Sequence, residues 1–381
     1  MDADFFRLLN ALVALPSVSS ANPIIDMGNR PVIDHLANVF STMGFNCEVL
    51  TLAGNPYKAN LIATRGTGEG GLVLSGHTDT VPFDENLWTV NPLQLTQKDG
   101  KLFGLGSTDM KGFFAVVHTA LQVFRDATFK HPLIILATAD EESSMDGARA
   151  LVRQGRPKGR YALIGEPTGL RPVNRHKGVM MERIRVQGKS GHSSNPALGK
   201  NALEAMHDVI GELLRFRTQL QRDYHNPHFV LDVPTLNLGV IHGGDNPNRI
   251  CGHCELEFDI RLLPGMASDS LRAAIRERIA PVIAQHQVEF TFTPLFPGVE
   301  AFANESNDLL QTCEKLTGYS GQSVSYGTEA PFLQQLGMDT IVLGPGSIDV
   351  AHQPDEYMAL NQVQPCIDLL QKLIRHYCLA D

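Results

Sequence analysis

Acidic and imidazole side chains stand directly after several short apolar segments of the chain. Segments that stay apolar without alternating are typical of strands that are covered on both faces of a sheet. The polar residues that follow these segments are His77 and Asp79 after "LVLSG", Asp140, Glu141 and Glu142 after "IILATA", Glu166 after "ALIG", and His352 and Asp355 beyond "TIVLGPGS". A further carboxylate, Asp109, lies in the glycine-rich stretch "LFGLGSTDMKG", just before an apolar helix.

Taken singly, these residues have ordinary explanations, such as a helix N-cap for Asp109 or a solvated loop for Glu141 and Glu142. Together they are expected to converge, because ligands in open α/β sheets bind beyond the carboxyl ends of the strands. Unpaired carboxylates would repel one another in such a cleft, so a cation is expected there. Two histidines and several carboxylates suit Zn²⁺ or a similar divalent ion. One zinc needs only three protein ligands, so the number of candidates favours two ions that share a bridging carboxylate.

His77 and Asp79 are separated by one residue. In an extended chain, residues two apart point to the same side. We therefore expect His77 to bind an ion while the carboxylate of Asp79 orients its imidazole.

The segments that position these residues divide into two domains. Residues 1–178 alternate helices, expected at 3–15, 29–43 and 112–125, with strands, expected at 59–64, 72–76, 132–138 and 161–165. This order predicts an α/β sheet with helices on both faces. Residues 179–293 follow the order strand, helix, strand, strand, helix, strand, with alternating strands, which predicts an inserted α+β ferredoxin-like (βαββαβ) domain. Residues 294–381 add one more buried strand and a terminal helix, and they are expected to return to the first sheet.

The composition is that of an ordinary globular protein. The formal net charge is −9, and no long run of Lys or Arg interrupts the sequence, so neither a nucleic acid nor an anionic membrane is expected as a partner. No apolar stretch approaches the length of a membrane span, and the N-terminal residues lack the basic start of a secretory signal. The six cysteines are sparse and are expected to be reduced thiols. We therefore expect a cytoplasmic location.

Five motifs resemble those of a known family. In order along residues 75–357, "SGHTDTVP", "GLGSTDMKG", "ATADEE", "IGEPT" and "AHQPDEY" are similar to the motif series of the dinuclear zinc amidohydrolases and peptidases. Further stretches, such as "SGHSSNPALGKNALEAMHDVIG", extend the resemblance over nearly the whole chain, and they are most similar to bacterial deacetylases of a basic amino acid. The resemblance implies a mixed-sheet catalytic domain interrupted by a lid domain that serves for homodimerisation.

The resemblance also implies a role for each candidate residue. His77 and Glu166 would bind the first ion, Glu142 and His352 the second, and Asp109 would bridge both. Asp79 would support His77, and Glu141 would be the general base. The ions are expected to be zinc, which cobalt could replace. The peptide bond between Asp109 and Met110 is expected to be cis.

The implied reaction is hydrolysis of the amide bond of a small N-acyl amino acid. Glu141 would take a proton from water and later deliver it to the leaving amine. His192, in "KSGHSSNP", would reach the active site of the partner subunit and donate a hydrogen bond to the oxyanion.

A basic amino acid carries an α-carboxylate and a side-chain ammonium. The candidates for binding the carboxylate are Arg261, Arg249, Asn248 and Lys177, and the candidate for the ammonium is Glu329. A metal-free binding module is disfavoured because every ligand of the motif series is present. A sister deacylase with another acyl group or amino acid stays open, because the metal-binding motifs do not discriminate between such substrates.

The stretch "CGHC", Cys251–Cys254, is similar to a thiol-oxidoreductase motif. Active cysteines of that kind need a helix N-terminus to lower the pKa of the first thiol. Here the motif leads into an alternating strand, and His253 supplies only one further zinc ligand. We therefore expect these cysteines to serve packing.

Overall fold

A computed structural model describes residues 3–305 and 307–379, which form two compact units. The first unit contains the residues up to Asn174, Asn304–Gln322 and the residues from Glu329 on. The second contains Arg175–Ala303 and the short segment Ser323–Thr328. For comparison, the domain limits predicted from the sequence are 1–178 with 294–381 and 179–293.

The main sheet of the first unit is mixed, in agreement with the predicted fold class. Its strands run in the order β1-β2-β6-β3-β7-β15. Strands β6, β3, β7 and β15 are parallel to one another, whereas β2 pairs antiparallel with both β1 and β6. The bounds are β1 (Asn46–Leu52), β2 (Asn55–Arg65), β3 (Leu72–His77), β6 (Leu133–Thr138), β7 (Tyr161–Pro167) and β15 (Asp339–Gly344).

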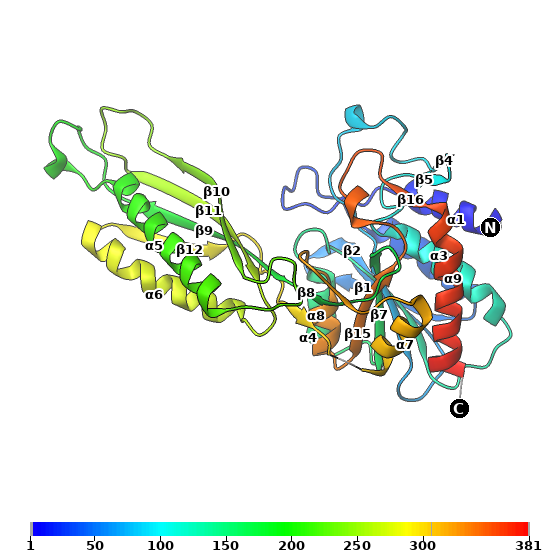
Figure 1. Cartoon of the computed structure of the whole chain (residues 1–381). Coiled ribbons are helices and arrows are strands. Elements are labelled where there is room, and N and C mark those ends of the chain that lie inside the picture. The colour runs from blue at the N-terminus through cyan, green and yellow to red at the C-terminus, as the bar shows by residue number, and fades with distance from the viewer. Residues whose placement is uncertain (1–2, 306, 380–381) are drawn as a thin grey trace. The chain divides into compact units, whose positions relative to one another are not determined.

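Helices cover both faces of this sheet. Alternate residues of β6 show why, since Leu133 and Ile135 belong to the large core cluster whereas Ile134 and Leu136 are buried on the opposite face. Helices α3 and α9 contact each other within the large cluster, whereas α4 and α8 contact each other, and α8 contacts β15, outside it (Figure 1). The helices of this unit are α1 (Ala3–Val13), α2 (Arg30–Ser41), α3 (Lys111–Leu121), α4 (Asp146–Gln154), α7 (Asp308–Thr317), α8 (Ala330–Gln335) and α9 (Leu360–Ile374).

A second, smaller sheet of the first unit joins two loops that are distant in sequence. Strand β5 (Lys101–Phe103) lies between β4 (Thr96–Lys98) and β16 (Tyr357–Ala359), and both pairings are antiparallel. The chain leaves β5 toward Asp109 and enters β16 from His352. The small sheet therefore holds the loops of two candidate site residues together.

The second unit has the predicted βαββαβ order. Its elements are β9 (Gly178–Gln187), α5 (Ala202–Asp223), β10 (Thr235–Gly243), β11 (His253–Leu262), α6 (Ser268–His286) and β12 (Glu289–Pro294). The antiparallel strands run in the order β10-β11-β9-β12, and α5 and α6 lie together along this sheet (Figure 1). Asn201 caps α5, because its side-chain oxygen accepts hydrogen bonds from the N–H groups of Leu203 and Glu204.

Three short strands lie where the chain passes between the units. Strand β8 (Val173–His176) carries the chain from the first unit into the second. Strands β13 (Phe302–Ala303) and β14 (Gln322–Val324) pair with it.

The cysteine pair of "CGHC" serves the core of the second unit. Cys254 is fully buried on β11 among Leu256, Phe258 and Ile260, and burial raises the pKa of its thiol. A raised pKa disfavours the reactive thiolate, as expected for a structural cysteine. All six cysteines of the chain are free thiols. None of the described helices is long and apolar enough to cross a membrane.

Candidate metal centre

His77 is the last residue of β3 and is fully buried. Its Nδ1–H donates to the backbone carbonyl of Asp79, with Nδ1 and the oxygen 3.0 Å apart, which leaves Nε2 free to bind an ion. The sequence assigned this orienting contact to the Asp79 carboxylate, but the nearer carboxylate oxygen lies 3.7 Å from Nδ1. The other carboxylate oxygen of Asp79, Oδ2, accepts the backbone N–H of Glu142 at 3.0 Å.

Asp109 lies between the two histidines. Its Oδ1 is 3.0 Å from Nε2 of His77, and its Oδ2 is 3.2 Å from Nε2 of His352. His352 Nε2 is also 3.0 Å from a Glu142 oxygen, and His77 Nε2 is 3.9 Å from a Glu166 oxygen. The peptide bond between Asp109 and Met110 is cis, as predicted.

These contacts form two groups of three ligands that share Asp109. One group is His77, Asp109 and Glu166, and the other is Asp109, Glu142 and His352. In each group, one ligand atom per residue lies within 4.8 Å of the others. The members are the residues that the sequence assigns to each ion.

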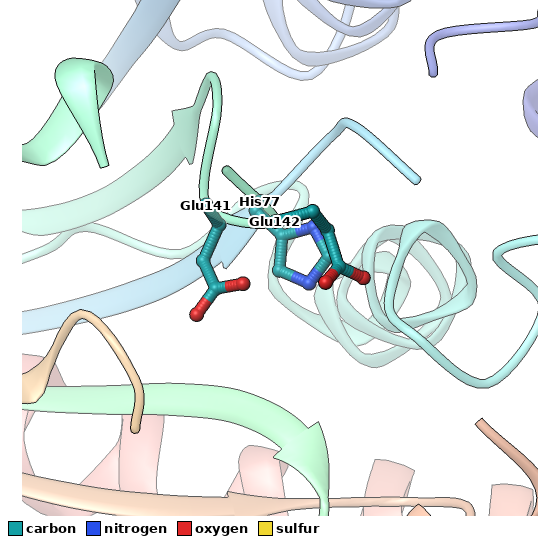
Figure 2. Close-up of side chains that lie close together, drawn as sticks. All are labelled: His77, Glu141 and Glu142. Carbon is teal, nitrogen blue, oxygen red and sulfur yellow. The ribbon is translucent and has the colours of Figure 1, made fainter. Parts of the chain in front are cut away.

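Glu141 belongs to a third close group, with His77 and Glu142. Figure 2 shows that the side chains of Glu141 and Glu142 leave the same loop in different directions near the imidazole. Two consecutive carboxylates can therefore serve different roles, one at an ion and one at a reacting molecule.

The buried carboxylates of the cluster favour bound positive charge, as the pKa values of its members show. Burial and the neighbouring carboxylates raise the pKa of Glu141 well above its usual value, and burial likewise raises the pKa of Glu166. Hydrogen bonds with Asp109 and Glu142 raise the pKa of His352 to about 10. For His77, burial alone would lower the pKa, but the contact with Asp109 and the nearby carboxylates raise it well above its usual value.

The residues present fit divalent ions. Imidazole nitrogens and carboxylate oxygens are ligands that zinc and related ions accept, and ligands must be deprotonated to bind. The pKa values of both histidines are raised, which favours their protonated forms beside the carboxylates when no metal ion is bound. Two divalent ions in the two groups of three would replace those protons.

Glu329, the candidate for the substrate ammonium, is buried in the same unit. Its Oε2 accepts the hydroxyl of Thr138 at 2.8 Å, and its Oε1 has no hydrogen-bond partner among the residues that the structure describes. Burial raises the pKa of Glu329 to about 7. Its charge also raises the pKa of Glu141 and of Glu166, which places it beside the cluster.

Three of the other candidates come together in the second unit. His192 forms an antiparallel bridge with Arg249, and the N–H of Ser193 donates to the carbonyl of Asn248. Nδ1 of His192 lies 2.8 Å from the hydroxyl of Ser194. His192 is exposed, so its ring is accessible within this unit.

Lys177 and Arg261 have structural partners in the second unit. Lys177 is buried, and its Nζ donates to the carbonyl of Val233 at 2.7 Å. Arg261 donates from Nε to Asp259 at 3.0 Å. These contacts position both side chains but do not by themselves assign them to a substrate.

Sequence reasoning missed two buried groups that hold the site loops. Lys58 pairs with Asp140 at 2.6 Å, and Asp140 directly precedes Glu141 in a left-handed backbone conformation with a φ of 62°. Glu356 accepts backbone N–H groups of the Asp109 loop. Of Lys58 and Glu356, only Glu356 could have been singled out from the sequence, because it belongs to the "AHQPDEY" motif. Asp355 of the same motif accepts a hydrogen bond at Oδ1 from the backbone N–H of Thr89, at 2.8 Å.

The sequence of the chain matches a known protein family over most of its length. Residues 73–376, which include every candidate residue, match the model of peptidase family M20/M25/M40. The chain belongs to this family. It is 48% identical, over 375 residues and 98% of each chain, to the acetylornithine deacetylase of Klebsiella pneumoniae (strain 342).

Solved structures of M20 proteins share the fold at low sequence identity. The metallo-carboxypeptidase Sso-CP2 of Sulfolobus solfataricus matches with a TM-score of 0.76 at 16% identity, over 98% of this chain and 99% of that one. The YXEP protein of Bacillus subtilis, described as a dinuclear metal-binding peptidase, matches with a TM-score of 0.66 at 14% identity, over 98% of both chains. The M20 fold therefore covers nearly the whole chain.

We predict that metal binding releases protons. Metal-free protein at pH 7.5 holds His352 protonated, because its pKa is about 10, and a bound ion must displace that proton. The apparent affinity should therefore rise with pH, by roughly tenfold per pH unit for each proton released. Calorimetric titration with Zn²⁺ in buffers of different ionisation enthalpy measures the number of protons.

The control is His207→Ala, which removes an exposed histidine of α5 and should leave the release unchanged. A binding enthalpy that does not depend on the buffer would contradict the prediction.

Proposed function

We propose that the protein hydrolyses N2-acetyl-L-ornithine to L-ornithine and acetate, in arginine biosynthesis. The observation that carries this proposal is the 48% identity to an acetylornithine deacetylase over 98% of both chains. The two groups of three potential ligands around Asp109 support it, because two metal ions that share a carboxylate can activate water for hydrolysis.

In the proposed metal centre, His77, Asp109 and Glu166 hold one ion, and Asp109, Glu142 and His352 hold the other. Imidazole nitrogens and carboxylate oxygens are ligands that zinc accepts, and cobalt could replace it. When bound, two such ions lower the pKa of a water molecule and polarise the carbonyl of the scissile amide.

The residues of the chain supply the proton transfers. Glu141 accepts a proton from the attacking water and later donates it to the leaving amine. Its buried surroundings, which raise its pKa, suit a carboxyl group that must hold a proton between the two steps. Asp79 keeps His77 in the tautomer that presents Nε2, through its carbonyl, and fixes the Glu142 backbone through its carboxylate.

The remaining candidate residues are proposed to recognise the substrate. We propose that Glu329 receives the side-chain ammonium, since it is a buried carboxylate whose Oε1 lacks a described partner. Arg249, Asn248, Arg261 and Lys177 remain the candidates for the α-carboxylate. The inserted unit would act as a lid and dimerisation domain, and its His192 would donate to the oxyanion in the partner subunit of a homodimer.

The His192→Ala variant should keep its metal and lose turnover, and loss of metal would assign the residue to the metal centre instead.

We predict a substrate preference that tests the function. The zinc-loaded protein should show a higher kcat/KM for N-acetylornithine than for N-acetylcitrulline or N-succinyl-diaminopimelate, and chelation should abolish the activity. A preference for either competitor would assign the protein to a sister deacylase with the same mechanism. Without activity on any of the three, the proposed function would be wrong.

We predict that Glu141→Gln keeps its metal and loses turnover. Removal of the general base should lower kcat by about 10²–10⁴, the usual contribution of acid–base catalysis. Metal content measured by mass spectrometry should equal that of the wild type, whereas Glu142→Gln should lose metal. Near-normal turnover of metal-loaded Glu141→Gln would contradict the assignment of Glu141 as base.

A further inference from the structure

Glu356 is a buried carboxylate that has no role in the mechanism described above. Its side chain is 2% exposed and accepts three backbone N–H groups of one loop. Oε1 accepts from Thr108 at 2.8 Å and from Asp109 at 3.0 Å, and Oε2 accepts from Gly106 at 3.1 Å. Because one side chain accepts three N–H groups of the same loop, this carboxyl group is an anchor for the loop.

The loop that carries Asp109 depends on such an anchor. It is too tight for side chains at two positions, since a Cβ on Gly106 would lie 2.7 Å from the Lys111 side chain and one on Gly112 would lie 2.1 Å from the Ser107 carbonyl. Gly106 also has a φ of 74°, which residues with a side chain rarely adopt. The loop is buried, and its N–H groups therefore need acceptors from another segment.

The anchor comes from the loop that carries His352. Glu356 follows His352 by four residues and leads directly into β16. Two more bonds tie the same segments: the Gly104 N–H donates to the Glu356 carbonyl at 3.0 Å, and the Thr108 hydroxyl donates to the Tyr357 carbonyl at 2.6 Å. Together with the pairing of β16 and β5, these contacts hold the loops of Asp109 and His352 against each other.

The two candidate ion sites differ in how they are supported. His77 and Glu166 lie within β3 and β7, so the main sheet positions them directly. Glu142 and His352 lie on loops, and His352 adopts a left-handed conformation with a φ of 58°. The second group of ligands therefore depends more on contacts between loops than the first.

We propose that Glu356 is a positioning residue that fixes Asp109 relative to His352 and so pre-forms the site of the second ion. The inference rests on the proposed metal centre. Partners that orient metal ligands typically change metal affinity by about 10–100-fold when they are lost. Loss of the Glu356 carboxylate is therefore expected to weaken metal binding, and to lower turnover only when the metal concentration is below saturation.

The test is the Glu356→Gln variant, titrated with Co²⁺ in the metal-free protein and followed by visible absorption and calorimetry. Glutamine keeps the shape of the side chain but places an NH₂ group against a backbone N–H. We expect the second Co²⁺ to bind at least about tenfold more weakly, with the first affected less. At saturating metal, kcat should recover toward the wild type and KM should change little.

The matched control is Glu314→Gln. Glu314 also accepts a backbone N–H, from Gly321 at 2.7 Å, but it lies on α7 and takes no part in the metal centre. Its variant should bind both ions like the wild type. Equal weakening in the two variants would assign the effect to general destabilisation and overturn the proposal, as would unchanged binding in Glu356→Gln.

If Glu356→Gln does not fold, Glu356→Asp tests the same link, because it keeps the carboxyl group but shortens its reach toward the N–H groups of the Asp109 loop. Weaker binding of the second ion supports the proposal, and unchanged binding overturns it. The wild-type titration distinguishes failure of the proposed metal centre from failure of the proposed role of Glu356. If the wild type does not bind two ions, the proposed metal centre is wrong. If the wild type binds two ions and the variant binds them equally well, only the role of Glu356 is wrong.

Discussion

The contact of one carboxylate with two imidazoles is the constraint on which the rest of the site depends. The two oxygens of Asp109 face His77 and His352, and Glu142 and Glu166 complete a group on either side. So many acidic groups in a buried place are stable only with positive charge among them. Protons on the histidines supply that charge in the metal-free protein, and divalent ions would supply it in the active enzyme.

The fold positions these groups by two different means. Parallel strands bring His77 and Glu166 to one edge of a rigid sheet, where no further device is needed. The loops of Asp109, Glu142 and His352 are instead held by buried charged side chains: Glu356 accepts from the Asp109 loop, Asp79 accepts from Glu142, and Lys58 binds Asp140. Charged side chains outside the two groups of potential ligands thus hold the loops that carry those ligands.

The sequence predicted the parts of this arrangement that periodicity and motifs encode. Uniformly apolar strands identified the sheet, alternating strands identified the βαββαβ unit, and the polar residues after the strands identified the cluster around Asp109. The small sheet of β4, β5 and β16 was missed, because three-residue strands are too short to show a period. Lys58 was missed because a single lysine carries no sign that it will be buried against a carboxylate 82 residues away. The sequence placed Asp79 beside His77, but side-chain direction along a strand did not reveal that one oxygen of its carboxylate also accepts the backbone N–H of Glu142.

The central claim is that two ions share Asp109, and metal stoichiometry of two variants tests it most directly. Metal-free Asp109→Ala and Glu142→Ala would each be equilibrated with a limited excess of Zn²⁺, freed of unbound metal and measured by mass spectrometry. If Asp109 bridges, its loss depletes both sites, whereas loss of Glu142 depletes one and leaves about one ion per chain. Equal retention of one ion by both variants would show that Asp109 serves a single site, and the account of a shared bridging carboxylate would be wrong.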